Sequence, residues 1–244
     1  MDDKSLVIRK AETFVKDFMG KYDCSHDWHH VQRVVRQALA LAKAESQTRP
    51  VDMFVVHLAA LLHDVDDAKY VQGSEDQLNS RGFLTHAGVD SDRAELVCKI
   101  IDSVSFRKEL LQAEQAKQGL GSVEERQWRQ ECVELACVQD ADRLDAMGAF
   151  GVLRCAAFSG ARNRPLHNPR DNSGCGETTY EQYAANSSGA SGSAVSHFYE
   201  KLLKLAGMMK TELGRKEAQR RHEFMLLFLE NINEEFSFGE VHGY

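Results

Sequence analysis

The sequence predicts an all-α protein. Only three prolines occur among 244 residues, and through most of the chain the apolar residues recur at the three- and four-residue spacing of helices. A hydrophobic content of 43% is enough to build a sizeable core at this length. We therefore expect one domain over residues 1–244, a helical bundle with one long polar loop.

The first three helices can be placed from their end signals. An amphipathic pattern ends at a glycine, a polar residue can cap the next helix, and a proline with an aspartate precedes the third. The second helix carries apolar residues from Val31 to Ala42 at helical spacing. The expected elements are residues 3–19 ended by Gly20, a helix capped by Asp27 or Ser25, and a helix from Pro50 and Asp52 to His63 and Asp64.

The middle of the chain alternates between helical and exposed stretches. Residues 93–103 again show helical spacing, whereas residues 108–127 are charged and interrupted by glycines, so we expect them to be exposed. Two more helices are expected at 131–144 and 148–159. The predicted core of the domain then spans about residues 24–150.

Residues 160–192 differ from the rest in composition. They are rich in Asn, Ser, Gly and Arg, too polar to pack and longer than an ordinary connection. Loops of this kind are either disordered or form active-site lids. The C-terminal helices are expected over 193–235, in "SAVSHFYEKLLKLAGMM" and in a last helix from about residue 215.

Charge, cysteine usage and hydropathy exclude several classes of protein. The net charge of −7 argues against a nucleic-acid polymer as partner, because such binders need a basic surface. The six cysteines show no CxxC pairing, which favours reduced thiols in the core over disulfides or a zinc site. No stretch approaches the ~18 apolar residues of a membrane span. We expect a soluble cytoplasmic protein without membrane contact, and a homodimer remains open.

Two aspartates occupy positions where the helical pattern calls for apolar side chains. Asp140 shares a stripe with Ala136 and Leu144, and Asp64 follows Leu61 and Ala60 on theirs. Burying an ionised carboxylate without a partner costs several kcal/mol, so each needs a cation, a proton or a metal. For Asp140, Arg143 on the same helix is one alternative partner.

Histidines supply further candidate ligands. His63 directly precedes Asp64, although an imidazole at a helix end can also simply cap carbonyl groups. His30 lies at the start of the second helix, at the edge of its buried face. Two imidazoles and two carboxylates form a mixed nitrogen and oxygen site for one divalent ion: Mn, Fe, Co, Ni or Zn, or Mg with more waters.

The segments "HHVQRV", "LLHDVDD" and "VQDADRLDAMGA", in this order, resemble the HD-domain superfamily of metal-dependent phosphohydrolases. "SHDW", "HDVDDAK", "QDADRLDAMGAFG" and "HFYEKLLKL" are similar to the YedJ/YpgQ-like subgroup, over about Cys24 to Glu235. The resemblance implies an all-helical fold and hydrolysis of phosphate esters or anhydrides. It also implies a single HD domain with a divalent metal on His30, His63, Asp64 and Asp140.

The same resemblance guides the choice of residues around the metal. Negative charge on a phosphoryl group needs cations, and proton transfer needs a titratable side chain nearby. Residues beside the ligands could orient water, act as general acid or base, or hold a ligand in place. The candidates for phosphate or nucleotide contact are Lys69, Arg143, Arg164, His197 and Lys201, and those for catalysis are His26, Asp27 and Asp67.

Three functions remain open at this point. The leading one is a phosphohydrolase acting on a nucleotide, with some subgroup members similar to nucleoside triphosphate pyrophosphohydrolases that release pyrophosphate. The second is a phosphomonoesterase or phosphodiesterase on another small phosphate ester. The third is a non-catalytic scaffold that only binds metal. A two-metal centre with His26 or His29 as an added ligand is the less favoured alternative.

Overall fold

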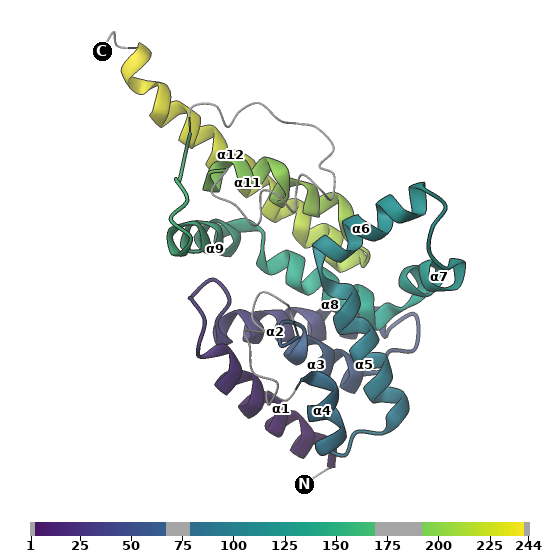
Figure 1. Cartoon of the computed structure of the whole chain (residues 1–244). Helices are drawn as coiled ribbons and strands as arrows, with labels where there is room; N and C mark the ends of the chain where they lie inside the picture. The colour runs from purple at the N-terminus through teal and green to yellow at the C-terminus, as the bar shows by residue number, and fades with distance from the viewer. Residues whose placement is uncertain (1–2, 67–78, 169–191, 242–244) are drawn as a thin grey trace.

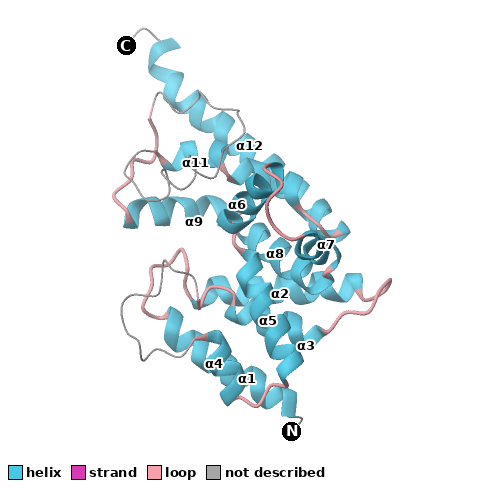
Figure 2. Ribbon diagram, turned by 45° about the vertical axis from the view of Figure 1, so that its right-hand side comes forward, coloured by secondary structure: helices cyan, strands magenta, loops and turns pink. Residues whose placement is uncertain are grey.

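The computed structural model describes residues 3–66, 79–168 and 192–241, and every regular element in these ranges is a helix (Figures 1 and 2). The prediction of an all-α fold is confirmed. The elements are α1 (Asp3–Met19), α2 (Trp28–Glu45), α3 (Met53–Leu62), α4 (Ser80–His86), α5 (Ser91–Val104), α6 (Phe106–Lys117), α7 (Val123–Glu131), α8 (Val133–Asp145), α9 (Gly148–Ala161), α11 (Ala194–Glu200), the 3-10 helix η1 (Leu202–Met208) and α12 (Glu212–Val241).

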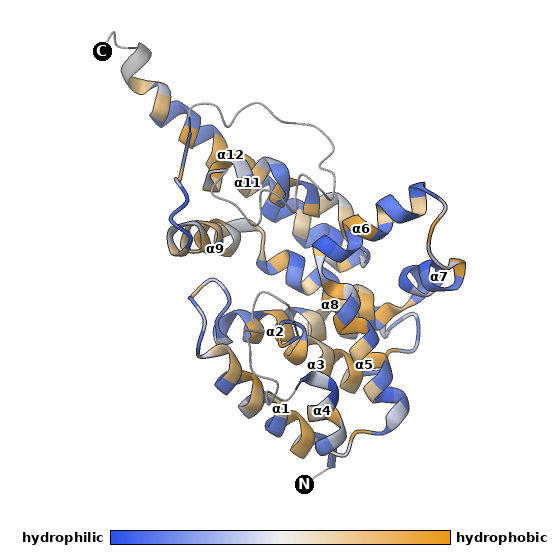
Figure 3. Ribbon diagram, viewed as in Figure 1, coloured by the Kyte–Doolittle hydropathy of each residue, from blue (hydrophilic) through white to orange (hydrophobic). Residues whose placement is uncertain are grey.

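Helix α3 forms the centre of the N-terminal part of the molecule. Seven of its ten residues are buried, because α1, α2, α5 and α8 pack around it. Most of this helix has no contact with solvent, which explains why its sequence is almost wholly apolar. The contrast with the polar α7 is visible in Figure 3. The C-terminal end of α3 therefore lies at the boundary of this core.

Helix α8 joins this core to the C-terminal helices. It packs against α2, α3 and α5 on one side and against α9 and α12 on the other. Eleven of its thirteen residues are buried, including polar ones. The long α12 packs against α9 and η1 through Ala218, Met225 and Leu229, and the two chain ends lie at opposite extremes of the molecule (Figure 1). Polar groups on α8 must consequently be satisfied by neighbours on both sides.

The predicted helix ranges agree with the structure to within a few residues where the apolar pattern is long. Asp27, rather than Ser25, caps α2, and Asp52 caps α3 by accepting hydrogen bonds from the backbone of Phe54 and Val55. The sequence did not predict α4, which is short. The charged stretch 108–127 holds most of α6 and α7, so its polar composition reflects solvent-facing helices. Of the expected loop, residues 169–191 lie outside the described ranges.

Cysteines and hydropathy agree in part with expectation. Cys98, Cys137 and Cys155 are buried free thiols, and burial raises the pKa of Cys137 to about 12 and that of Cys155 to about 11. Cys24, however, is exposed rather than part of the core, because it lies in the polar connection before α2. Within the described ranges, no helix combines the length and the apolar character that crossing a bilayer requires.

Candidate metal centre

The first turn of α2 fixes His30. The side chain of Asp27 accepts a hydrogen bond from the His30 backbone nitrogen at 2.9 Å, as an N-cap does. The imidazole is fully buried, and its Nδ1 lies 2.7 Å from the Asp145 carboxylate. An ionised carboxylate can only accept, so Nδ1 carries the proton. The lone pair of His30 is therefore on Nε2.

The end of α3 fixes His63 in the same sense. His63 is the C-cap residue of α3, and its Nδ1 donates to the Ala60 carbonyl at 2.9 Å. The imidazole does cap a carbonyl group, and this cap also determines which nitrogen carries the proton. Its Nε2 consequently faces the Nε2 of His30, with the ring centroids 5.3 Å apart.

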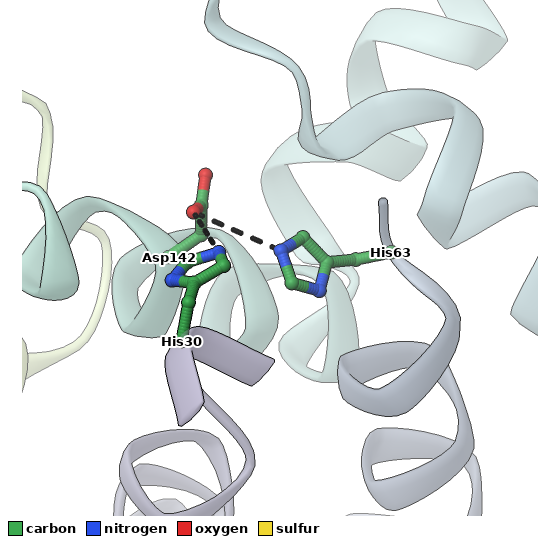
Figure 4. A group of neighbouring side chains, drawn as sticks. All are labelled: His30, His63 and Asp142. Atoms are coloured by element: carbon green, nitrogen blue, oxygen red, sulfur yellow. Dashed lines mark ion pairs between the residues drawn. The ribbon is translucent and has the colours of Figure 1, made fainter. Parts of the chain in front are cut away.

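Two carboxylates meet these nitrogens. Asp64 Oδ2 lies 3.4 Å from Nε2 of each histidine, and Asp142 Oδ1 lies 3.8 Å from both. Figure 4 shows the carboxylate of Asp142, on α8, joined by dashed lines to His30 and to His63. Nε2 of His30, Nε2 of His63 and Oδ2 of Asp64 are buried without any hydrogen-bond partner. Such atoms are expensive to leave unsatisfied unless a ligand completes them.

Electrostatics of the cluster favour a cation. Burial alone would raise the pKa of Asp64, but His63 and His30 hold it well below its usual range. Burial alone would lower the pKa of His63, but Asp64 and Asp142 outweigh this and raise it to about 9. The two carboxylates thus attract positive charge into the site. Two imidazole nitrogens and two carboxylate oxygens are a donor set that fits a divalent ion of the transition series.

The cluster is closed on one side and open on the other. His30 and His63 are buried and the Asp64 side chain is 16% exposed, whereas that of Asp142 is 33% exposed. A metal held by these four residues would therefore meet solvent or substrate on the Asp142 side. Open coordination positions distinguish catalytic from structural metal sites.

Behind His30, a second layer of charge holds Asp145 in place. Arg33 donates to both of its oxygens, from Nε at 2.7 Å and from Nη2 at 3.0 Å, and Arg154 Nη1 lies 3.2 Å from Oδ2. Although burial opposes ionisation, His30, Arg33 and Arg154 hold the pKa of Asp145 far below its usual range. Carboxylates that orient a ligating histidine in this way are usual at metal sites.

Comparison with known proteins identifies the family of this chain. A family model described as HD domain matches residues 27–147. The uncharacterized protein YpgQ of Bacillus subtilis (strain 168) is 33% identical over 234 residues, which cover 93% of this chain and 94% of YpgQ. The chain belongs to the HD-domain family.

Solved structures are similar to this chain over nearly its whole length. The crystal structure of Bacillus subtilis YpgQ in complex with ADP is 28% identical with a TM-score of 0.67, and the alignment covers 96% of this chain and 97% of that one. An HD-superfamily hydrolase from Bacillus thuringiensis is 30% identical with a TM-score of 0.64, covering 96% and 98%. The protein is an HD-superfamily hydrolase, for which metal-dependent phosphohydrolysis is the general kind of reaction.

Asp140, the fourth ligand expected from the sequence, is not part of the cluster formed by His30, His63, Asp64 and Asp142. Its carboxylate accepts hydrogen bonds from the backbone of Lys210 at 3.0 Å and from the backbone and hydroxyl of Thr211 at 2.7 and 2.8 Å. A Cβ at Gly214 would lie 2.6 Å from Asp140 Oδ2. Asp140 therefore secures the start of α12, and Asp142, two residues later, faces the histidines in its place.

Arg143, expected to bind phosphate, is also engaged elsewhere. Its side chain is only 4% exposed, it pairs with Glu109 of α6, and it donates to the Met208 carbonyl at 2.5 Å. Asp140 Oδ1 lies 3.9 Å away. Because the contacts with Glu109 and Met208 connect α8 to α6 and to η1, the structure places Arg143 in the packing between helices rather than at the cluster.

The other expected residues divide into three groups. His26 lies beside the cluster, with its ring centroid 5.8 Å from that of His30, and Asp27 acts on His30 through the N-cap. Burial raises the pKa of the Cys155 thiol, and the positive charges of Arg164 and Lys201 act against this. His197 Nδ1 lies 4.0 Å from Glu200 Oε2. These three residues therefore belong to the region of α9 and α11. Asp67 and Lys69 lie outside the described residues, and their roles stay predictions.

Sequence reasoning missed Asp142 and Asp145. Both lie in "DADRLDAMG", which the resemblance already singled out, but Asp140 was favoured because it fell on the apolar stripe. Helical spacing offered a signal for these two residues. Positions two and five after Asp140 lie on a different face of the helix from Asp140. Gly148, the first residue of α9, has a φ of +67°, which glycine adopts more readily than other residues.

Proposed function

We propose that the protein hydrolyses nucleotides with one divalent metal held by His30, His63, Asp64 and Asp142. The observation that carries the proposal is the convergence of three buried atoms without hydrogen-bond partners, His30 Nε2, His63 Nε2 and Asp64 Oδ2, beside the partly exposed Asp142. A structural cluster would satisfy these atoms from within the protein. Mn, Fe, Co, Ni and Zn suit the mixed donor set, and Mg would retain more waters.

The chain's own residues set the geometry of this chemistry. A divalent ion, when bound, would act as a Lewis acid on a phosphoryl oxygen and make water a better nucleophile near neutral pH. Asp145 and the Ala60 carbonyl hold the two imidazoles with their lone pairs toward the ion. The buried side of the cluster excludes bulk water, and substrate enters beside Asp142.

His26 is the proposed proton-transfer residue. Its Nδ1 lies 2.7 Å from Ser25 Oγ, and its ring is edge-on to that of His30. An imidazole close to the reacting group can accept a proton from water or donate one to a leaving oxygen. Asp67 and Lys69 follow Asp64 closely in the chain, and we retain them as a proposed second-layer carboxylate and phosphate contact.

A nucleotide is the proposed substrate class. YpgQ, which matches this chain over nearly its whole length, was crystallised in complex with ADP. A divalent metal held by these four residues would bind the phosphate chain, and Arg164, His197 and Lys201 remain candidates for the rest of the nucleotide. Cleavage between the α and β phosphates with release of pyrophosphate is the specific reaction we favour.

Product identity tests this proposal. The purified protein would be supplied in turn with Mn²⁺, Mg²⁺, Co²⁺ or Zn²⁺ and with nucleoside tri-, di- and monophosphates, and pyrophosphate and orthophosphate would be measured separately. Pyrophosphate release supports the proposal. Orthophosphate alone would contradict pyrophosphate release, and orthophosphate from the monophosphates would support a phosphomonoesterase. Stoichiometric metal binding without turnover on any nucleotide or phosphate ester would indicate a scaffold.

A further inference from the structure

The guanidinium of Arg154, on α9, contacts both the carboxylate that binds His30 and the residue that precedes His26. Arg154 Nη1 lies 3.2 Å from Asp145 Oδ2, and its Nε donates to the Ser25 carbonyl at 2.7 Å. Asp145 is the acceptor for His30, and Ser25 directly precedes His26. The Arg154 side chain is 12% exposed, so both contacts are shielded from solvent. Its planar fork suits two acceptors at once.

The Ser25 end of this contact determines how His26 is oriented. Ser25 is fully buried, its backbone nitrogen donates to Asp23 Oδ1 at 2.9 Å, and its hydroxyl also donates to that oxygen. Because the hydroxyl donates its one hydrogen to Asp23 Oδ1, Ser25 Oγ accepts the hydrogen bond from His26 Nδ1 at 2.7 Å. Nε2 is thereby the nitrogen of His26 that can take up or release the catalytic proton.

The Asp145 end does not depend on Arg154 alone. Arg33 binds both Asp145 oxygens, at 2.7 and 3.0 Å, and its guanidinium stacks over Phe150 at 4.3 Å from the ring centroid. Without Arg154, Asp145 keeps a bidentate cation and His30 keeps its acceptor. The Ser25 carbonyl, in contrast, loses the donor that α9 provides.

We propose that Arg154 is a positioning residue that fixes the His26 imidazole relative to the metal ligand His30. The proposal rests on the function proposed above, in which His26 transfers a proton. It predicts that Arg154 governs turnover more than metal binding. Misplacing a reacting group by about 1 Å can cost on the order of a hundredfold in rate.

The kinetic test compares Arg154→Ala with Arg162→Ala. Arg162 is a matched control at the end of the same helix, with its guanidinium 5.1 Å from the ring centroid of Phe158, which itself contacts the His26 ring. For Arg154→Ala we expect kcat to fall at least about tenfold, with KM and Mn²⁺ affinity within about threefold of wild type. Millimolar guanidinium should restore part of kcat. Arg162→Ala should match wild type.

A second measurement needs no turnover. In protein with ¹⁵N-labelled histidine, the His26 ring signals and their broadening by Mn²⁺ should change in Arg154→Ala and not in Arg162→Ala. Arg154→Lys keeps a charge near Asp145 but cannot serve two acceptors, so it should show the same change if the alanine variant folds poorly.

Two results would overturn the proposal. One is unchanged His26 signals in both Arg154 variants. The other is a loss of Mn²⁺ affinity in Arg154→Ala as large as in Asp145→Asn, which would mean that Arg154 serves only the carboxylate. If the wild type hydrolyses no nucleotide, the proposed function fails, while the histidine spectra still decide the role of Arg154.

Discussion

The two faces of α8 treat their carboxylates differently. On the face toward α12, Asp140 is fully buried and receives hydrogen bonds from Lys210 and Thr211. On the face toward α2 and α3, Asp142 is partly exposed and lies beside two imidazole nitrogens that lack hydrogen-bond partners. A carboxylate whose acceptors are filled by backbone donors is a structural group. A carboxylate beside nitrogens that lack hydrogen-bond partners indicates a site for a ligand from outside the chain.

Replacing Asp142 should have the largest effect. In Asp142→Ala the site loses one of two anionic ligands, so Mn²⁺ affinity should fall at least about a hundredfold, beyond the usual cost of outer-layer changes. Phosphohydrolase activity should fall with it. Isothermal titration of the metal-free protein measures the affinity, and near wild-type binding would remove Asp142 from the ligand set.

Replacing Asp140 should damage stability instead. Asp140→Ala leaves the buried donors of Lys210 and Thr211 without their acceptor, which we expect to cost about 2–4 kcal/mol of unfolding free energy. Denaturant unfolding monitored by circular dichroism measures this loss. Mn²⁺ affinity should stay within about threefold of wild type. The comparison of the two faces fails if Asp140→Ala loses metal as Asp142→Ala does.

Asp145→Asn should fall between these two cases. The amide can still accept from His30, but Arg33 and Arg154 then place uncompensated positive charge behind the ligand. We expect Mn²⁺ affinity to fall about 10- to 100-fold, the range typical of residues that orient a ligand. Metal titration at fixed pH would show it, and unchanged affinity would mean that the second layer is electrostatically irrelevant.

The smallest expected effect concerns the turn between α8 and α9. Gly148 has a φ of +67°, and a Cβ there would lie 3.0 Å from Arg221 Cγ. Gly148→Ala should lower the unfolding free energy by about 1–3 kcal/mol through backbone strain. Thermal unfolding with and without Mn²⁺ measures this loss, and a stability equal to wild type would show that the turn tolerates a side chain.

The sequence predicted the fold and named three of the four proposed metal ligands for identifiable reasons. Long apolar periods fixed α1, α2, α3 and α8, and cap residues such as Asp52 fixed where they begin. His30, His63 and Asp64 were found because helix ends put them at the core boundary. Asp140 was misplaced because helical spacing tells which residues are buried and not against which neighbour. Only the packing of α12 on α8 reveals that Lys210 and Thr211 satisfy Asp140.

The contacts of Asp145 and Arg154 could not be predicted from the sequence, for a related reason. Asp145 is separated from Arg33 by 112 positions, and Arg154 from Ser25 by 129. No local sequence pattern predicts such pairs, because they depend on how α2, α8 and α9 pack against one another.

The most direct test of the central claim is a crystal structure of the protein grown with Mn²⁺, with the anomalous signal locating the ion. The account predicts one peak within coordination distance of His30 Nε2, His63 Nε2, Asp64 and Asp142, with Asp140 still bound to Thr211. An ion on Asp140, or no ion between the two histidines at saturating Mn²⁺, would contradict it.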